Sequence, residues 1–298
     1  MSSRSAKSSC RVAVYLGPGD RLGNHYFLSF LCARWRKAGV EIIVLDDPAR
    51  VVEADAAVLH VNATRRPAGY ERVLDCYPLV VNGRVRDISK RLISTQLVTR
   101  DAQYDGPVIV KTNRNCFGVP DLNSRRRSDR LGELRSRILD RLLPLRRSIR
   151  VGQSYPIYDR PRQVPRAVWW DRELVVEKFR PERRDGVYCL RTWIFFGSRE
   201  KASLSTSHDP VVKRVNTIQS EFIADVPAPI REARRRLGFD YGKFDFVIHE
   251  GEPILLDTNP TPTCSGQPSP RLDAMADELS PGLGELMGTG SGLAPGPA

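Results

Sequence analysis

The sequence predicts an α/β protein that begins with a parallel sheet and ends its folded part with an antiparallel hairpin. Short apolar runs at residues 11–16, 40–45 and 55–61 alternate with a helical pattern over residues 22–37, which is typical of parallel α/β sheets. Near the end, two apolar runs flank Glu250-Gly251-Glu252, which is the pattern of a strand–turn–strand unit. The chain has 298 residues, 41% of them hydrophobic, which is enough for one large or two ordinary domains.

The first part of the chain follows this pattern element by element. Residues 1–10 are rich in serine and are predicted to be disordered. The helix over residues 22–37 carries apolar side chains at helical spacing and ends at Gly39. A short helix over residues 68–77 and a fourth strand over residues 79–82 complete a domain predicted to span residues 11–85.

The middle of the chain carries a strand that ends in Lys111, a mixed strand at residues 174–179 and a longer strand at residues 187–196 that contains Arg191. An arginine among apolar residues must find an anion, because burying an unpaired charge is costly. We weigh two kinds of partner for Arg191, a bound anion and the acid of a structural salt bridge, and expect the bound anion. A basic helix over residues 232–237 precedes the hairpin, and residues 267–298 read mostly as a disordered tail.

Composition limits the protein's surroundings and partners. No apolar run approaches the ~20 residues of a membrane-spanning helix, and the N-terminal apolar stretch is too short for a secretory signal. The six cysteines lie far apart without a CxxC pair, so we expect reduced thiols and a cytoplasmic location.

The net charge of +12 indicates an anionic partner. Residues 124–150 contribute much of it, with ten arginines against three acidic residues. We interpret this segment as an amphipathic helix with a solvated basic face; a docking face for a nucleic acid, an acidic polymer or the substrate is the alternative. Few aromatic residues are interleaved there, which argues against stacking on bases.

The hairpin predicts a cation site. With Gly251 at its tip, Asp245 falls opposite Asp257, and strand alternation puts Asp245, Val247 and His249 on one face. The same alternation puts Leu255, Asp257 and Asn259 on that face of the second strand. Facing carboxylates repel unless a positive charge lies between them, and Mg²⁺ prefers oxygen ligands. Two solvated acids on an exposed rim are the alternative.

The runs FDFVI and LLDTNPTPT resemble the C-terminal metal-binding hairpin of ATP-grasp enzymes, and the resemblance extends over roughly residues 79–262. It implies that Asp245, Asp257 and Asn259 hold the Mg²⁺ ions of ATP, with Mn²⁺ as an alternative. The family usually has Glu where this chain has Asp257. The shorter side chain requires a closer backbone or a water-mediated ligand.

The resemblance also assigns upstream residues. It implies that Lys90, at the start of a helix, and Lys111, at the end of a strand, contact the ATP phosphates. It places Glu177, Lys178 and Phe179 at the strand between the two lobes, where backbone groups bind the adenine edge.

Two further residues, Arg191 and Lys213, are assigned to catalysis by the same resemblance, holding the transferring phosphate or the substrate. The loop after Lys111 departs from the family, because Asn113, Arg114 and Asn115 stand where several glycines are usual. Fewer glycines leave fewer backbone amides free to wrap phosphate, although Arg114 and Asn115 offer side-chain donors.

The resemblance completes the predicted fold class: an N-terminal half-Rossmann parallel sheet followed by a two-lobed α+β ATP-grasp domain. That domain would span residues 86–266, with lobes at about 86–175 and 176–266. The implied activity is an ATP- and Mg²⁺-dependent ligase that activates a carboxylate as an acyl phosphate and joins it to an amine or thiol. The substrate would be a small molecule. The basic net charge of the protein favours an acidic one. Two alternatives stay open: a kinase of the same fold acting on a small polyanion, and a non-catalytic nucleotide-binding or nucleic-acid-associated protein.

Overall fold

The computed structural model describes residues 10–118, 121, 144–152 and 154–288. The predicted disorder of the first residues falls almost wholly outside this range, and so does most of the arginine-rich segment at residues 124–150, which was predicted as an amphipathic helix. Within the range, a helix begins at Pro144 and runs to Gly152 as α6. None of the described helices is long and apolar enough to cross a membrane.

The N-terminal domain is a parallel sheet of four strands in the order β2-β1-β3-β4. The strands are β1 (Arg11–Leu16), β2 (Glu41–Leu45), β3 (Ala56–His60) and β4 (Val80–Val81). Helices α1 (Phe27–Lys37) and α2 (Glu71–Leu74) connect them. The predicted parallel sheet is confirmed, but α1 begins at Phe27, five residues later than the apolar spacing indicated.

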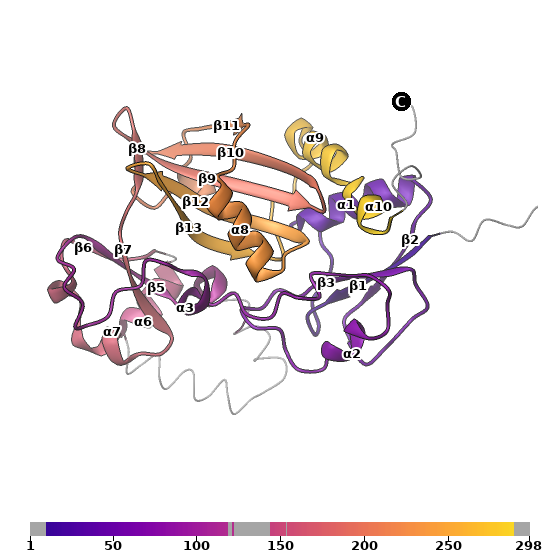
Figure 1. Ribbon diagram of the computed structural model, residues 1–298, viewed down its shortest axis with the longest axis horizontal. Helices are drawn as coiled ribbons and strands as arrows, with labels where there is room; N and C mark the ends of the chain where they lie inside the picture. The colour runs from indigo at the N-terminus through magenta and orange to yellow at the C-terminus, as the bar shows by residue number, and fades with distance from the viewer. Residues whose placement is uncertain (1–9, 119–120, 122–143, 153, 289–298) are drawn as a thin grey trace, which may run out of the picture.

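A small antiparallel sheet, in the order β6-β5-β7, forms the first lobe of the domain that follows (Figure 1). It contains β5 (Val108–Thr112), β6 (Ile157–Tyr158) and β7 (Leu174–Lys178), with the short helices α3 (Lys90–Ile93), η1 (Asn115–Gly118), η2 (Pro161–Gln163) and α7 (Arg166–Trp170) around it. Because β7 pairs with β5 along its whole length, this lobe extends to Lys178. The predicted lobe boundary at residue 175 is therefore a few residues too early.

The second lobe is a larger antiparallel sheet in the order β11-β10-β9-β12-β13, with β8 beside β9. Its strands are β8 (Glu182–Arg184), β9 (Val187–Phe196), β10 (Arg199–Ser207), β11 (Gln219–Ile223), β12 (Tyr241–His249) and β13 (Glu252–Asn259), and it also holds η3 (Arg214–Asn216). Helix α8 (Ala228–Leu237) covers one face of this sheet, as Figure 1 shows. It ends at Gly238, whose φ of 72° provides the left-handed C-cap.

The hairpin of β12 and β13 has the predicted opposition of Asp245 and Asp257. Its turn, Glu250-Gly251, has positive φ at both residues (50° and 83°), as two-residue hairpins often require. The register shifts between Asp245 and Phe246, so that Leu256 is an extra residue on β13. This bulge corrects the simple alternation, because Leu255 now opposes Phe246 and packs in the core beneath α8.

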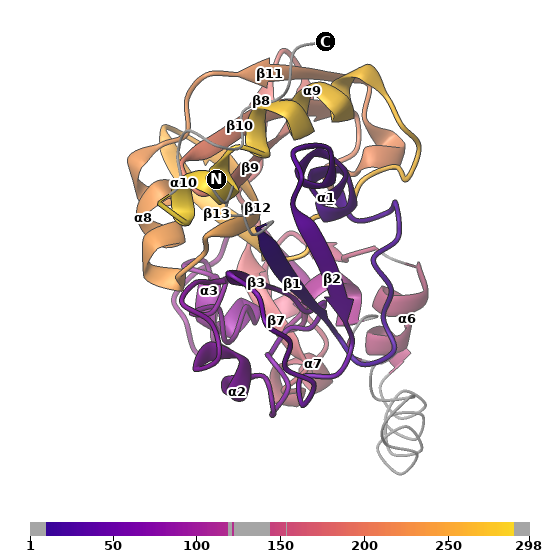
Figure 2. The same cartoon turned by 90° about the vertical axis from the view of Figure 1, so that its right-hand side faces the viewer.

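Residues 270–286 form two packed helices, which corrects the prediction of a mostly disordered tail. Helix α9 (Pro270–Leu279) lies beside α1, as Figures 1 and 2 both show, and helix α10 (Gly282–Leu286) follows it. Their buried Ala276, Leu279 and Leu283 belong to one core with the N-terminal sheet and the end of β9. The apolar positions of α9 thus join the N-terminal domain to the second lobe. Residues 289–298 lie outside the described residues.

Substituting Gly282 with alanine tests this docking. A Cβ atom there would lie 2.2 Å from the carbonyl oxygen of Phe196, a contact that forces the helix away from β9. Overpacking of this kind destabilises by about 1–3 kcal/mol, so the midpoint of thermal unfolding should fall by several degrees. The control is Gly152→Ala, where a Cβ meets nothing within 4 Å. Equal unfolding midpoints for Gly282→Ala and the control would contradict the docked position of α10.

Candidate functional site

A cleft of ≈ 320 Å³ lies between the two antiparallel sheets. Strand β5 and the end of β7 line one side, while β9, β12, β13 and the loop at residues 210–213 line the other. Most of the residues predicted from the sequence meet here: Lys90, Lys111, Lys178, Phe179, Lys213, Asp245, Asp257 and Asn259. Glu177 lies directly behind Lys111, and Arg191 lies elsewhere.

The three predicted metal ligands share this cleft on two neighbouring strands. Asp245 and Asp257 are paired across β12 and β13, and Asn259 is two residues further along β13. The side-chain oxygen Oδ1 of Asn259 accepts hydrogen bonds from the backbone amide of Thr261 at 2.8 Å and from the Thr261 hydroxyl at 3.0 Å. The side chain of Asn259 therefore has a fixed orientation at the end of the hairpin.

Two lysine ammonium groups balance the opposed carboxylates. The Lys90 ammonium pairs with Asp257, and the Lys243 ammonium lies 2.9 Å from Asp245 Oδ2. The Thr192 hydroxyl on β9 donates to Asp245 Oδ1 at 2.8 Å. The Lys90 side chain is only 4% exposed, so its partner Asp257 offsets most of the cost of burying that charge.

The donor set fits a hard divalent cation such as Mg²⁺, because two carboxylates and an amide oxygen face one cleft beside cationic groups suited to phosphate. The described residues hold no cluster of three His, Cys, Asp or Glu side chains, so a binding site here depends on Asn259 as well as the two acids. A cation at this position would either share the two carboxylates with the ammonium groups of Lys90 and Lys243 or displace those groups.

Lys111 stands at the end of β5 with its charge compensated. Its ammonium lies 2.7 Å from Glu177 Oε2 on the neighbouring strand β7, and both side chains are at most a tenth exposed. Within the described part of the chain, Glu177 Oε1 has no hydrogen-bond partner. The pair places a cation at the wall of the cleft, held by an acid behind it.

Two backbone amides at the end of β7, where the adenine contact is predicted, already have partners in the protein. The amide of Lys178 donates to the Gln96 carbonyl at 2.8 Å, and the amide of Phe179 donates to the Pro107 carbonyl at 2.8 Å. These two amides are engaged inside the first lobe and are not available to a base. The cleft still offers an apolar slot around Phe179, in which Ile109 and Leu256 take part.

Arg191 is not brought to the cleft, which corrects its assignment as a phosphate-binding residue. It opposes Phe246 on β12, whereas its neighbour Thr192 opposes Asp245, so Arg191 points to the other face of the sheet. There its guanidinium makes two 2.9 Å hydrogen bonds to the carboxylate of Glu182. Strand alternation thus selects the structural salt bridge, the alternative that the sequence left open.

Of the two side-chain donors predicted in the loop after β5, only one faces the cleft. Asn115 lines it, but Arg114 turns away and makes a bidentate pair with Glu173, with Nη2 donating to Oε1 at 2.7 Å. The backbone amide of Asn115 donates to the hydroxyl of Thr64 in the N-terminal domain at 2.9 Å. The loop is therefore anchored to the N-terminal domain.

The sequence analysis missed Lys243, Thr192 and Arg180. The signal for Lys243 was present, since it lies two residues before Asp245 on one strand and therefore on the same face. Thr192 carries no such signal, because only the pairing of β9 with β12 brings it to Asp245. Arg180 lines the cleft and pairs with Glu252 at 2.6 Å.

Lys243→Met should strengthen metal binding to the nucleotide-free protein. Removing the ammonium beside Asp245 removes a competitor for that carboxylate and a like charge close to the cation. We expect Mn²⁺ to bind at least about tenfold more tightly, a change of about 1.4 kcal/mol, measured by electron paramagnetic resonance. The control is Lys201→Met, which removes an exposed ammonium paired with Glu278 outside the cleft. Unchanged or weaker Mn²⁺ binding would contradict the competition.

Comparison with solved structures identifies the fold. The chain aligns with the D-alanine–D-alanine ligase from Bacillus anthracis complexed with ATP at a TM-score of 0.51 and 17% identity, covering 95% of this chain and 97% of that chain. A RimK domain ATP-grasp protein from Sphaerobacter thermophilus aligns at a TM-score of 0.46 and 14% identity, covering 91% of this chain and 99% of that chain. No protein-family model matches, and no curated protein matches in sequence. The chain has the ATP-grasp fold, as the resemblance implied.

Proposed function

We propose that the protein is an ATP- and Mg²⁺-dependent ligase that activates a substrate carboxylate and joins it to an amine or thiol. The observation that carries this proposal is the meeting of Asp245, Asp257 and Asn259 with Lys90, Lys111 and Lys213 in one cleft between the two lobes. A structural neighbour that aligns over 95% of this chain, at a TM-score of 0.51, is a ligase complexed with ATP, which supports the same function.

Each group in the cleft has a defined task in this proposal. Lys90, Lys111 and Lys213 neutralise the phosphates, and the apolar slot around Phe179 receives the base. Asp245, Asp257 and Asn259 hold the metal, with Thr192 orienting Asp245 through its 2.8 Å hydrogen bond. When bound, Mg²⁺ supplies charge stabilisation to the transferring γ-phosphoryl group. Lys243 lies beside Asp245 and adds a further positive charge to that region.

The proposed reaction needs no nucleophilic side chain from the protein. A carboxylate oxygen of the substrate attacks the γ-phosphorus, and the bond from that phosphorus to the β–γ bridging oxygen breaks, releasing ADP. The amine or thiol then attacks the acyl carbon and loses its proton, and inorganic phosphate leaves with the bonding pair. Positioning and electrostatic stabilisation by the lysines account for the catalysis.

The test is to incubate the protein with ATP, Mg²⁺ and a panel of amino acids, organic acids and polyols, and to measure ADP, phosphate and products by mass spectrometry. A joined product with equal amounts of ADP and phosphate supports the ligase. A phosphorylated acceptor without joining would instead establish a kinase. ATP binding without turnover across the panel would favour a non-catalytic nucleotide-binding protein.

A further inference from the structure

A second, wider hollow lies beside the cleft, with a volume of ≈ 870 Å³. We call it the arginine groove. It runs between the loop after β3, the start of α3, the loop after β5 and the approach to β7. It adjoins the cleft at α3, because Ser89 and Arg91 line the groove while Lys90 between them lines the cleft. The groove and the cleft therefore lie on two sides of the same short helix.

The charge of the groove is strongly positive. Five arginines and two acidic residues line it: Arg65, Arg66, Arg91, Arg114, Arg172, Asp121 and Glu173. Both acids are engaged by the same arginine, since Arg114 pairs with Glu173 and lies 3.8 Å from Asp121. Arg172 has no salt bridge to any residue that the structure describes, and the Arg91 Nη2 donates only to the Leu174 carbonyl. Arg65 pairs with Asp87 at 2.8 Å, although Asp87 does not line the groove. Arg91 and Arg172 are therefore the guanidinium groups of the lining that no described acid matches.

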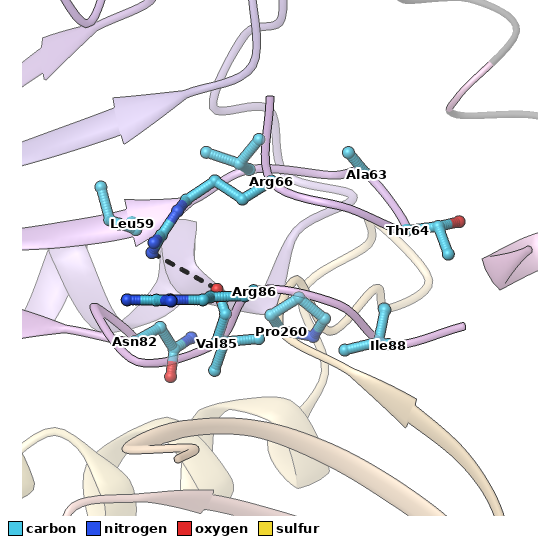
Figure 3. A pocket seen from close by; sticks show the side chains of 10 residues that line it. Leu59, Ala63, Thr64, Arg66, Asn82, Val85, Arg86, Ile88 and Pro260 are labelled. Carbon is cyan, nitrogen blue, oxygen red and sulfur yellow. Dashed lines mark hydrogen bonds between the residues drawn. The ribbon is translucent and has the colours of Figure 1, made fainter. Parts of the chain in front are cut away.

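A small cavity opens off the groove and shares Ala63, Thr64 and Arg66 with it (Figure 3). Its volume of ≈ 20 Å³ is about the space of one water molecule or one oxyanion oxygen. Figure 3 shows the guanidinium groups of Arg66 and Arg86 at the same end of the cavity, near Asn82. None of the described residues that line it is acidic.

Two buried donors of this cavity lack acceptors among the described residues, although Arg66 Nη1 donates to the carbonyls of Gly83 at 2.7 Å and Val85 at 3.4 Å. The Arg66 side chain is 6% exposed, and its Nε has no hydrogen bond within the described residues, with Glu71 no closer than 3.8 Å. The amide nitrogen of Asn82 is also buried without an acceptor there. Burial lowers the pKa of Arg66, and the like charge of Arg86 lowers it further while Glu71 opposes both. A buried donor without an acceptor is costly, and an anion supplies what is missing.

We propose that the arginine groove binds the acidic chain of the substrate, a peptide segment rich in carboxylates, with one carboxylate at Arg66 and Arg86. Guanidinium groups match carboxylates in a bidentate geometry, and the groove exceeds the ≈ 320 Å³ of the cleft, so it accommodates more than a single small acid. The proposal depends on the proposed ligase activity in one respect, because it takes the bound peptide to be the substrate of that activity. Binding itself requires no nucleotide.

The lining favours a peptide over a nucleic acid. Among the described residues, no aromatic side chain lines the groove or its small cavity, so this lining offers no surface on which bases stack. The polar residues Thr64, Ser89 and Asn113 suit hydrogen bonds to a peptide backbone.

The test is fluorescence anisotropy with fluorescein-labelled hexaglutamate and the full chain, without nucleotide. The variant Arg65→Gln/Arg172→Gln removes two exposed charges of the groove. Exposed ion pairs contribute about 0.2–1 kcal/mol each, so hexaglutamate should bind about two- to thirtyfold more weakly to this variant. The control Arg235→Gln/Arg236→Gln removes two exposed arginines of α8 and should bind like the unmodified protein. The unfolding midpoint of each variant confirms that it folds.

Three results would overturn the proposal. One is the absence of hexaglutamate binding at low ionic strength, and another is an equal effect of the groove and control variants. The third is a preference for a single-stranded oligonucleotide of equal charge that the groove variant abolishes, which would assign the groove to nucleic acid. None of these results depends on ATP turnover. If the ligase assay fails but the groove variant still weakens hexaglutamate binding, the proposed activity is rejected and the proposed binding site stands.

Discussion

Asp257→Asn is expected to reduce metal-dependent ATP turnover by about 10³-fold, equivalent to about 4 kcal/mol in the activation free energy. Asparagine keeps an oxygen that accepts from the Thr258 amide, as Asp257 Oδ1 does at 2.9 Å, so the hairpin should stay intact. It removes one of the two opposed charges that would hold the metal and leaves the buried ammonium of Lys90 without its counter-ion. The rate of ADP formation with a substrate from the panel measures the effect.

The matched control for this change is Glu250→Gln, which removes one negative charge from the exposed tip of the same hairpin. Its turnover should equal that of the unmodified protein, because the Glu250 side chain is 88% exposed and does not line the cleft. Unchanged turnover in Asp257→Asn would exclude the hairpin from the mechanism. Weaker Mn²⁺ binding by Asp257→Asn but not by Glu250→Gln would assign the loss to the metal site.

Arg191→Met is expected to lower the free energy of unfolding by about 3–5 kcal/mol while the folded protein keeps most of its ATP binding. The side chains of Arg191 and Glu182 are 8% and 5% exposed, so the substitution leaves a buried carboxylate without its main partner. Chemical denaturation measures the loss of stability, and nucleotide titration of the folded variant measures binding. A large loss of ATP affinity with unchanged stability would restore Arg191 to the phosphate site.

The double variant Glu182→Gln/Arg191→Met separates charge from packing. Replacing both partners removes the unpaired carboxylate, so the double variant should be more stable than Arg191→Met alone. If the two substitutions destabilise additively, the side chains do not interact as the 2.9 Å contacts indicate.

The same pair predicts a dependence of stability on pH. Burial raises the pKa of Glu182, but hydrogen bonds from Arg191 and the Ile248 amide lower it more, so the net pKa is below its usual 4.5. A lowered pKa in the folded state means that the carboxylate stabilises the protein above pH 4.5 and loses this contribution as the pH falls through the folded-state pKa. The unmodified protein should therefore lose more stability between pH 5 and pH 3 than the double variant.

Local patterns were sufficient for much of the fold. The alternation of strands and helices predicted the parallel N-terminal sheet, and the spacing around Gly251 predicted the opposition of Asp245 and Asp257. Both depend on near neighbours in the chain, where periodicity and turn chemistry act directly. The order of the motifs also predicted the ATP-grasp fold and the lysines that now line the cleft.

Other features depended on partners far away in the sequence. The pairing of β9 with β12 decides to which side of the sheet Arg191 points. The apolar neighbours of Arg191 in the sequence do not indicate that Glu182 lies beside it. The glycine- and proline-rich composition after residue 267 suggested a tail. The apolar side chains of α9 and α10 are nevertheless ordered, because α1 and β9 offer a surface that buries them.

The sequence by itself determined which residues could bind a nucleotide's phosphates and a metal, because strand alternation sets the face on which Asp245, Asp257 and Asn259 lie. Only the tertiary structure decided which charges meet. It paired Lys243 with Asp245, turned Arg191 toward Glu182 and gathered the arginine groove from four separate segments. The reason is physical: the partner of a charge is set by distance in space, and distant segments come together only when the three sheets pack.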